Sequence, residues 1–162
     1  MKIEYITADL MSAPEPFIVH GCNAQGVMGS GVAKLIRDKY PEAYTEYRAE
    51  YDRKGLAVGE TVWVNCGQHT VINAITQEFY GRDPDVVYVD YDGLATAMGM
   101  IDLVAVVLNA SLEPGHTTRV AMPLIGAGLA NGSWAKIAEI IENESKYFQP
   151  VVYLLDGFVP TS

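Results

Sequence analysis

Two glycine-rich segments, each placed directly after an apolar run, constrain this chain more than any other feature. Residues 20–34 read H-G-C-N-A-Q-G-V-M-G-S-G-V-A-K, and residues 125–133 read I-G-A-G-L-A-N-G-S. Glycine lets the backbone adopt positive φ and lets a ligand approach bare N–H groups. The first segment leads into an amphipathic helix pattern, and the unpaired amides and partial positive charge at a helix N-terminus favour an anion. Two such loops predict a diphosphate held from both sides.

The order of apolar runs and amphipathic stretches predicts an α/β layered fold. A length of 162 residues is typical of one domain, so residues 1–162 are expected to form a single domain. Strands are expected at residues 2–6, 17–20, 61–64, 70–75, 119–124 and 151–155, and helices after 31, from 41, over 91–110 and after 133. In such sheets a ligand lies outside the carboxyl ends of the strands, which is where both glycine loops fall. Residues 76–92 lack periodicity and are predicted to face the ligand.

Composition narrows the classes of function. There are 20 acidic and 11 basic residues, a formal net charge of -9, which argues against a nucleic-acid partner. Two cysteines and no secretory signal indicate a reduced, cytoplasmic setting, although a disulfide stays open. Three histidines without ligand spacing predict no metal site. The apolar stretch 94–110 contains Asp102 and is expected to be a buried helix rather than a membrane span.

The first glycine loop departs from two well-known phosphate-binding patterns. Gly26 and Gly31 have the spacing of a Walker A loop, but Val32 and Ala33 stand where Lys and Ser or Thr are needed. A Rossmann loop needs a third glycine at the position of Lys34 and follows the first strand rather than the second. Neither an ATPase nor a dehydrogenase is supported.

The motifs taken in order resemble those of the macrodomain, an ADP-ribose-binding family. They are A-D-L at 8–10, H-G-C-N-A-Q-G-V-M-G-S-G-V-A at 20–33 and P-L-I-G-A-G-L-A-N-G-S-W at 123–134. The resemblance covers nearly the whole chain and implies a three-layer α/β/α fold with a mixed central sheet of about six strands. With T-Q-E-F-Y-G at 76–81, the sequence is most similar to the ADP-ribose-1″-phosphate phosphatase branch.

The resemblance implies a small-molecule ligand, ADP-ribose or ADP-ribose-1″-phosphate, and a phosphatase that needs no metal or cofactor. The net charge and the interrupted apolar stretch predict no nucleic-acid or membrane partner. Asp9 would accept a hydrogen bond from the adenine amino group, and Asn23 would face the distal ribose. His20 would act as acid, base or nucleophile, so His20 and Asn23 are the expected catalytic residues; a buried core histidine is the alternative. The expected ligand-binding residues are Asp9, Leu10, Gly21, Asn23, Gly29, Ser30, Gly31, Val32, Leu124, Ile125, Gly126, Ala127, Gly128 and Leu129.

Several neighbouring residues keep two interpretations. Asp90 and Asp92 could partner His20 or could cap the following helix. Cys22 is more typical of a small buried hydrophobe than of a nucleophile. One of Tyr80, Tyr88 and Tyr91 could stack on adenine or cover the ribose, since three tyrosines within twelve residues raise the chance that one lines the site.

The sequence also departs from a related branch that removes ADP-ribose from acidic side chains. That branch uses a Lys after the strand at 70–75 and an Asp just after the second G-x-G. Here Gln77 lies in the first region and Ala130 follows Leu129 in the second, so that chemistry is not expected. Ser133 stands where many phosphatase-like members have an acidic residue. Two alternatives remain: a non-catalytic ADP-ribose reader, and a hydrolase acting on another ADP-ribosyl linkage.

Overall fold

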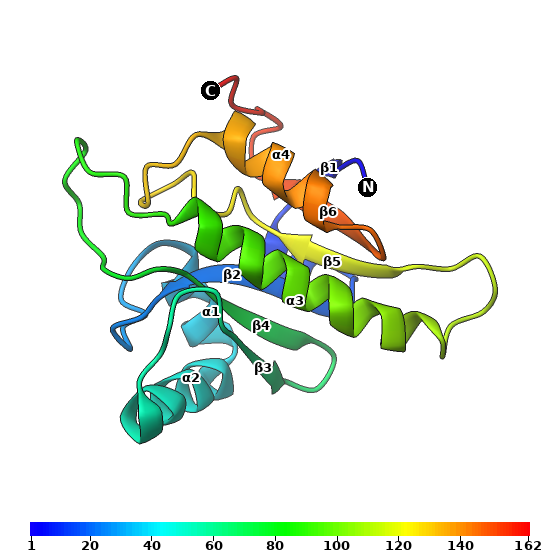
Figure 1. The fold of residues 1–162 in the computed structure, drawn as a ribbon, viewed down its shortest axis with the longest axis horizontal. Helices are drawn as coiled ribbons and strands as arrows, with labels where there is room; N and C mark the ends of the chain where they lie inside the picture. Colours follow the sequence, from blue (N-terminus) through cyan, green and yellow to red (C-terminus); the bar gives the residue numbers. More distant parts are fainter.

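The computed structural model describes residues 1–162 as one mixed sheet of six strands flanked by four helices, which confirms the expected three-layer α/β/α arrangement (Figure 1). Each expected strand and helix is present, with ends shifted by a few residues. In chain order the elements are β1 (Glu4–Thr7), the short 3-10 helix η1 (Leu10–Ser12), β2 (Phe17–Asn23), α1 (Gly31–Lys39), α2 (Pro41–Lys54), β3 (Thr61–Asn65), β4 (Thr70–Gln77), α3 (Tyr91–Asn109), β5 (Thr118–Met122), α4 (Trp134–Glu144) and β6 (Phe148–Leu154).

The sheet has the strand order β1-β6-β5-β2-β4-β3. Every neighbouring pair is parallel except β3 with β4, which form an antiparallel hairpin. The five parallel strands therefore end at the same edge, where the following loops can meet. At that edge Cys22 pairs with Ile75 and Asn23 pairs with Gln77, so β4 carries a bulge at Thr76, opposite the end of β2 and just before the first glycine loop.

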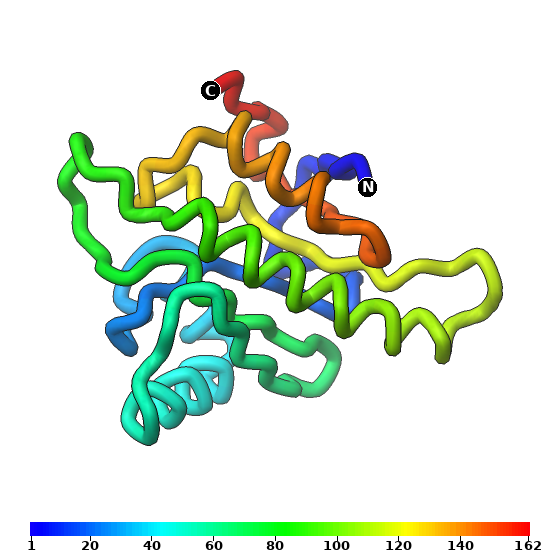
Figure 2. Tube along the Cα trace, viewed as in Figure 1, coloured from blue at the N-terminus to red at the C-terminus, as the bar shows by residue number.

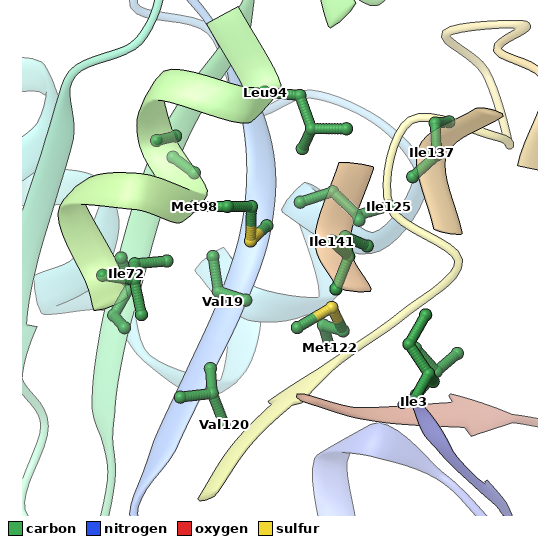
Figure 3. Packing of buried hydrophobic residues seen from close by; sticks show 14 of the residues in the cluster. Ile3, Val19, Ile72, Leu94, Met98, Val120, Met122, Ile125, Ile137 and Ile141 are labelled. Carbon is green, nitrogen blue, oxygen red and sulfur yellow. The ribbon is translucent and has the colours of Figure 1, made fainter. Parts of the chain in front are cut away.

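Helices α3 and α4 cover one face of the sheet, and α1 and α2 cover the other (Figures 1 and 2). The larger core lies under α3 and α4, where the apolar sides of the two helices interlock with residues from the middle of the sheet (Figure 3). Leu94, Met98, Ile137 and Ile141 contribute to this core from the helices. A second core lies under α1 and includes Ile36. Burial on both faces explains the apolar runs at residues 17–19 of β2 and 120–122 of β5.

The helix starts are fixed by local chemistry visible in the sequence. Pro41 occupies the first turn of α2, where a missing N–H costs nothing. The Ser133 hydroxyl accepts from the Lys136 amide at the start of α4, where a helix is expected after residue 133. The Asp90 carboxylate accepts from the Gly93 amide at 2.9 Å, and Asp92 lies in the first turn of α3. The capping interpretation of these two carboxylates is therefore the one that the structure shows.

Helix α3 is long and apolar enough to cross a membrane by composition alone, with a mean hydropathy of 1.5 over 18 residues. Buried core helices of soluble proteins can have the same length and mean hydropathy. In this fold α3 packs against α4, β4, β5 and β6, and Asp102 lies in its buried face. The Asp102 carboxylate accepts from the Tyr147 amide, which gives that polar group a partner inside the protein.

Candidate functional site

Three adjoining cavities form one groove along the carboxyl edge of the sheet. We call them the apolar slot (about 290 Å³), the waist (about 350 Å³) and the end pocket (about 340 Å³). The slot and the waist share Val32, Pro123 and Leu124 as lining residues. The waist and the end pocket share five others, namely Gly21, Ser30, Ala33, Gln77 and Leu129. The groove thus passes from an apolar end to a polar end between the two glycine loops.

The apolar slot lies between η1, α1 and the end of β6. Its walls are mostly aliphatic, with Leu10, Leu35 and Leu154 among them, and Asp9 and Asp156 are its charged members. The Asp9 side chain caps η1, because Oδ1 accepts from the Met11 amide at 3.0 Å. Oδ2 of Asp9 makes no hydrogen bond within the protein, so it is available to a donor in the slot.

The waist is lined by backbone amides that the protein does not use. On one side, α1 begins at Gly31, and the amides of Gly31, Val32 and Ala33 donate to no carbonyl of the chain. The N-cap residue Ser30 makes no capping hydrogen bond, which leaves its hydroxyl free as well. On the other side, the amides of Gly128 and Leu129 are also without an acceptor. Unpaired donors on both sides, with a helix dipole behind one set, suit an anion between them.

Glycine is required in these loops for two different reasons. At Gly126 φ is +78°, and a Cβ would lie 2.9 Å from Cγ2 of Val89, so both the backbone and the packing exclude a side chain. At Gly128 φ is not in the positive region and a Cβ would meet nothing within 4 Å, because it would point into open space. Gly126 therefore shapes the loop, whereas Gly128 keeps the groove open.

The end pocket is the polar part of the groove. Its side chains include those of Asn23, Gln77, Tyr80 and Arg82. Asn23 is tightly held: Oδ1 accepts from the Gln25 amide at 3.0 Å and from the Tyr47 hydroxyl at 3.0 Å, while Nδ2 donates to the Val27 carbonyl at 2.8 Å. One Nδ2 hydrogen of Asn23 stays available, so the side chain can donate to a ligand from a fixed position.

The segment between β4 and α3 forms the outer wall of this pocket, as its lack of periodicity predicted. Tyr80 lines the pocket, whereas Tyr88 and Tyr91 hold loops by accepting from the amides of Asp83 and Ser133. Gln77 and Arg82 also line the groove and were not among the expected site residues. The aperiodic segment was the available signal for both, but nothing in the sequence singled them out from its other polar residues.

His20 is the expected site residue that the structure does not bring to the groove. Successive residues of β2 face opposite sides of the sheet, and His20 faces α2, where its side chain is fully buried. Its Nε2 donates to Oδ1 of Asn73 at 2.6 Å, and Nδ2 of Asn73 donates in turn to the Ala43 carbonyl. Burial lowers the pKa of His20 to about 4, so the imidazole is neutral at pH 7. In this structure His20 is therefore a core histidine with a polar partner, which was the alternative interpretation, and it does not face the groove as expected.

Asp90 and Asp92, the two acidic partners considered for His20, do not lie next to it. The imidazole contacts Asn73 and the Cys22 thiol, whose Sγ lies 3.5 Å from Nε2. Burial raises the pKa of Cys22 well above its ordinary range, so this thiol is not a poised nucleophile. Asp90 and Asp92 belong to the start of α3, on the opposite face of the sheet.

All the residues expected to bind ligand line the groove, and the structure divides them among its three parts. Asp9, Leu10, Val32 and Leu124 line the slot. Those lining the waist are Gly21, Ser30, Gly31, Val32, Leu124, Ile125, Gly126, Ala127, Gly128 and Leu129, and those lining the end pocket are Gly21, Asn23, Gly29, Ser30 and Leu129. Asn23, the second expected catalytic residue, is therefore within reach of a bound molecule.

Comparison with known proteins gives a consistent set of matches. The family model described as Macro domain matches residues 19–87, which contain the first glycine loop and the segment through Val87. The DNA ADP-ribosyl glycohydrolase of Mycobacterium tuberculosis is 28% identical over 141 residues, or 85% of this chain. That match spans only 37% of the length of the mycobacterial protein.

Two further matches extend over most of the chain. The ADP-ribose 1″-phosphate phosphatase of Scheffersomyces stipitis is 25% identical over 173 residues, covering 93% of this chain and 99% of the yeast protein. The solved structure of the macrodomain of Mycobacterium tuberculosis DarG superposes with a TM-score of 0.74 at 24% identity, covering 93% of this chain and 96% of that one. At this identity the superposition shows a shared fold.

Proposed function

Because this chain belongs to the macrodomain family, we propose that its groove binds ADP-ribose and that the protein hydrolyses the phosphate ester of ADP-ribose-1″-phosphate. The observation that carries the proposal is the order of the three cavities. An apolar slot, an amide-lined waist and a polar pocket follow one another in the same order as the base, the diphosphate and the distal ribose of that ligand.

The slot suits adenine by shape and by chemistry. Its aliphatic walls would bury the faces of the base, which are apolar. The free oxygen of Asp9 would accept a hydrogen bond from the exocyclic amino group. A base with a carbonyl oxygen at that position would instead meet the carboxylate as a second acceptor, so the slot should prefer adenine.

The waist suits the diphosphate without a basic side chain. The free amides of Gly31, Val32 and Ala33 would face one side of the diphosphate, and those of Gly128 and Leu129 would face the other. Backbone donors fixed in place hold an anion with little reorganisation, which also lets them stabilise charge as a phosphoryl group is transferred.

The end pocket would hold the distal ribose and its phosphate. In the proposed reaction, water attacks phosphorus and the bond between phosphorus and the ribose 1″-oxygen breaks, releasing orthophosphate and ADP-ribose. Asn23, Gln77 and Tyr80 can orient the ribose and the water by hydrogen bonds. His20 takes no direct part in this account, because it lies on the far side of β2.

The relatives support hydrolysis of an ADP-ribose derivative and leave the linkage to experiment. The yeast phosphatase matches over nearly the full length of both chains, which favours the phosphate ester. The mycobacterial glycohydrolase favours a nucleobase linkage, but the aligned part is a minority of that protein. Here Gln77 lies in the wall where a related branch uses a Lys, and this also favours the phosphate ester.

The test is phosphate release from ADP-ribose-1″-phosphate together with the affinity for ADP-ribose. Wild type should release orthophosphate. Gly128→Val should lose both phosphate release and ADP-ribose binding while staying folded, because the valine side chain would fill the open waist. Tight binding of ADP-ribose without phosphate release would refute the phosphatase and leave either a non-catalytic reader or a hydrolase acting on another ADP-ribosyl linkage. Absence of ADP-ribose binding by folded wild type would refute the whole proposal.

A further inference from the structure

One basic side chain lines the groove, and it stands at the polar end. The residues around the slot, the waist and the end pocket include Asp9, Asp156 and Arg82 as their charged members. Both carboxylates belong to the slot, so Arg82 is separated from them by the whole waist. Arg82 makes no ion pair and no side-chain hydrogen bond within the protein, whereas six of the other basic side chains are paired with carboxylates.

We propose that Arg82 recognises the terminal phosphate of the substrate and so makes the site prefer ADP-ribose-1″-phosphate over ADP-ribose. This inference rests on the proposed function, because it assumes that the ligand lies with its adenine in the slot. It adds a residue that determines specificity, in a loop that carries none of the glycine motifs.

The position of Arg82 matches the place where the phosphate has to lie. The end pocket adjoins the waist through Ser30, Gln77 and Leu129, so a ribose that continues from the diphosphate enters this pocket. A phosphate on the far carbon of that ribose then lies beyond the reach of the waist amides. The other polar side chains of the pocket, those of Asn23, Ser30, Gln77 and Tyr80, offer hydrogen bonds but no positive charge.

The chemistry of a phosphate monoester calls for a group of this kind. Such a phosphate carries between one and two negative charges near neutral pH, and moving it out of water costs free energy unless a charge or strong donors replace the solvent. A guanidinium can do this with two parallel N–H donors in fixed geometry. Unphosphorylated ADP-ribose offers only a hydroxyl at this position, so Arg82 would gain much less from it.

The loop around Arg82 is held in place by contacts that are independent of any ligand. Nδ2 of Asn131 donates to the carbonyls of Asp83 at 3.0 Å and Val86 at 2.8 Å, which ties this segment to the second glycine loop. The Asp83 amide donates to the Tyr88 hydroxyl at 3.2 Å, and Gly81 packs so closely on Tyr88 that a Cβ would lie 2.2 Å from that hydroxyl. The backbone on both sides of Arg82 is therefore fixed, so ligand binding would have to order only the Arg82 side chain.

The overall charge of the protein makes this single cation significant. At a formal net charge of -9, the surface as a whole repels anions, so preference for an extra phosphate has to come from a local contact. The preference should also weaken as ionic strength rises, because Arg82 is exposed to solvent at the rim of the pocket.

The test compares two ligands, ADP-ribose and an analogue in which a methylenephosphonate replaces the 1″-phosphate. The phosphorus–carbon bond is not hydrolysed, so affinity is measured whether or not the protein is a phosphatase. Dissociation constants would be measured by calorimetry for wild type, Arg82→Gln, Arg82→Lys and the control Arg53→Gln. Arg53 pairs with Glu50 at the end of α2, away from the groove, and its replacement makes the same change in net charge.

Wild type and Arg53→Gln should bind the phosphonate about 10- to 100-fold more tightly than ADP-ribose, as charge-assisted hydrogen bonds predict. Arg82→Gln should lose this preference while binding ADP-ribose as wild type does, and Arg82→Lys should keep part of it. The inference is overturned if Arg82→Gln keeps the preference, or if it weakens both ligands equally. Equal affinity of wild type for the two ligands would also overturn it, yet the proposed ADP-ribose binding would stand.

Discussion

Acidification should destabilise this protein through one buried side chain, His20. The pKa of His20 is lowered from 6.5 to about 4, mainly because burial disfavours the imidazolium. The unfolded chain therefore binds a proton at a pH where the folded protein does not, so stability is lost as pH falls from about 6.5 toward 4. The neighbouring Cys22 and Tyr47 have raised pKa values and stay neutral throughout this range.

The magnitude follows from the pKa difference at ~1.4 kcal/mol for each pH unit. His20 should cost ~1.4 kcal/mol of unfolding free energy by about pH 5.5 and ~2.5 kcal/mol by about pH 4.5. Above pH 7 it should cost nothing. Since small domains are stable by about 5–15 kcal/mol, a loss of this size is readily measured.

The assay is urea denaturation of wild type and His20→Gln between about pH 7.5 and 4.5. Glutamine can donate to Oδ1 of Asn73 as the imidazole does, but it does not titrate. The difference in unfolding free energy between the two proteins should shift with pH by the amounts above, because all other titrating groups cancel in the comparison. His20→Gln should also release phosphate at close to the wild-type rate.

Two outcomes would refute this reasoning. One is a difference in stability between the two proteins that does not change with pH. The other is an NMR titration of His20 with a pKa near 6.5, which would mean that the imidazole reaches solvent. Loss of phosphate release in a stably folded His20→Gln variant would show that His20 is required for catalysis.

Two further expectations follow from the groove. Gly126→Ala should lower the unfolding free energy by about 1–3 kcal/mol, because it forces alanine to positive φ against Val89, whereas Gly128→Ala should leave the melting temperature unchanged. Equal melting temperatures for the two variants would contradict the distinction drawn between these glycines. Wild type should bind ADP-ribose about 10-fold more tightly than the analogue that carries hypoxanthine in place of adenine. Asp9→Asn should reduce this difference in dissociation constant. If calorimetry shows equal affinity of wild type for the two ligands, Asp9 does not recognise the base.

Much of the fold could be predicted because local rules and tertiary structure agree. Continuous apolar runs identified the strands that are buried on both faces, and residues such as Pro41 and Ser133 marked helix starts. The glycine loops could be placed in one groove because parallel strands end at a common edge. Strand ends were less certain: β2 continues to Asn23, beyond the expected end at His20, since its last residues pair with β4 through a bulge.

The parts that could not be predicted depend on side-chain direction and on distant contacts. Whether His20 faces the groove or the core depends on the register of β2, which a short apolar run does not reveal. Arg82 gains its position from contacts of its loop with Asn131 and Tyr88, and such contacts have no local signature. In the sequence, Gln77 differs from the Lys of a related branch, but only the structure shows that it lies beside the bulge and lines the groove.

Because successive residues of β2 face opposite sides of the sheet, one short motif has two separate roles. One role is to line the groove, and the other is to pack against α2. In H-G-C-N, Gly21 has no room for a Cβ beside Thr76 and Ile125 and borders the groove, while His20 and Cys22 lie against α2. A shared H-G-C-N string in two proteins is thus evidence of a common way of packing α2 on the sheet as much as of common chemistry. For inferring activity within this family, agreement at the groove-lining positions of the motif carries more information than agreement at His20.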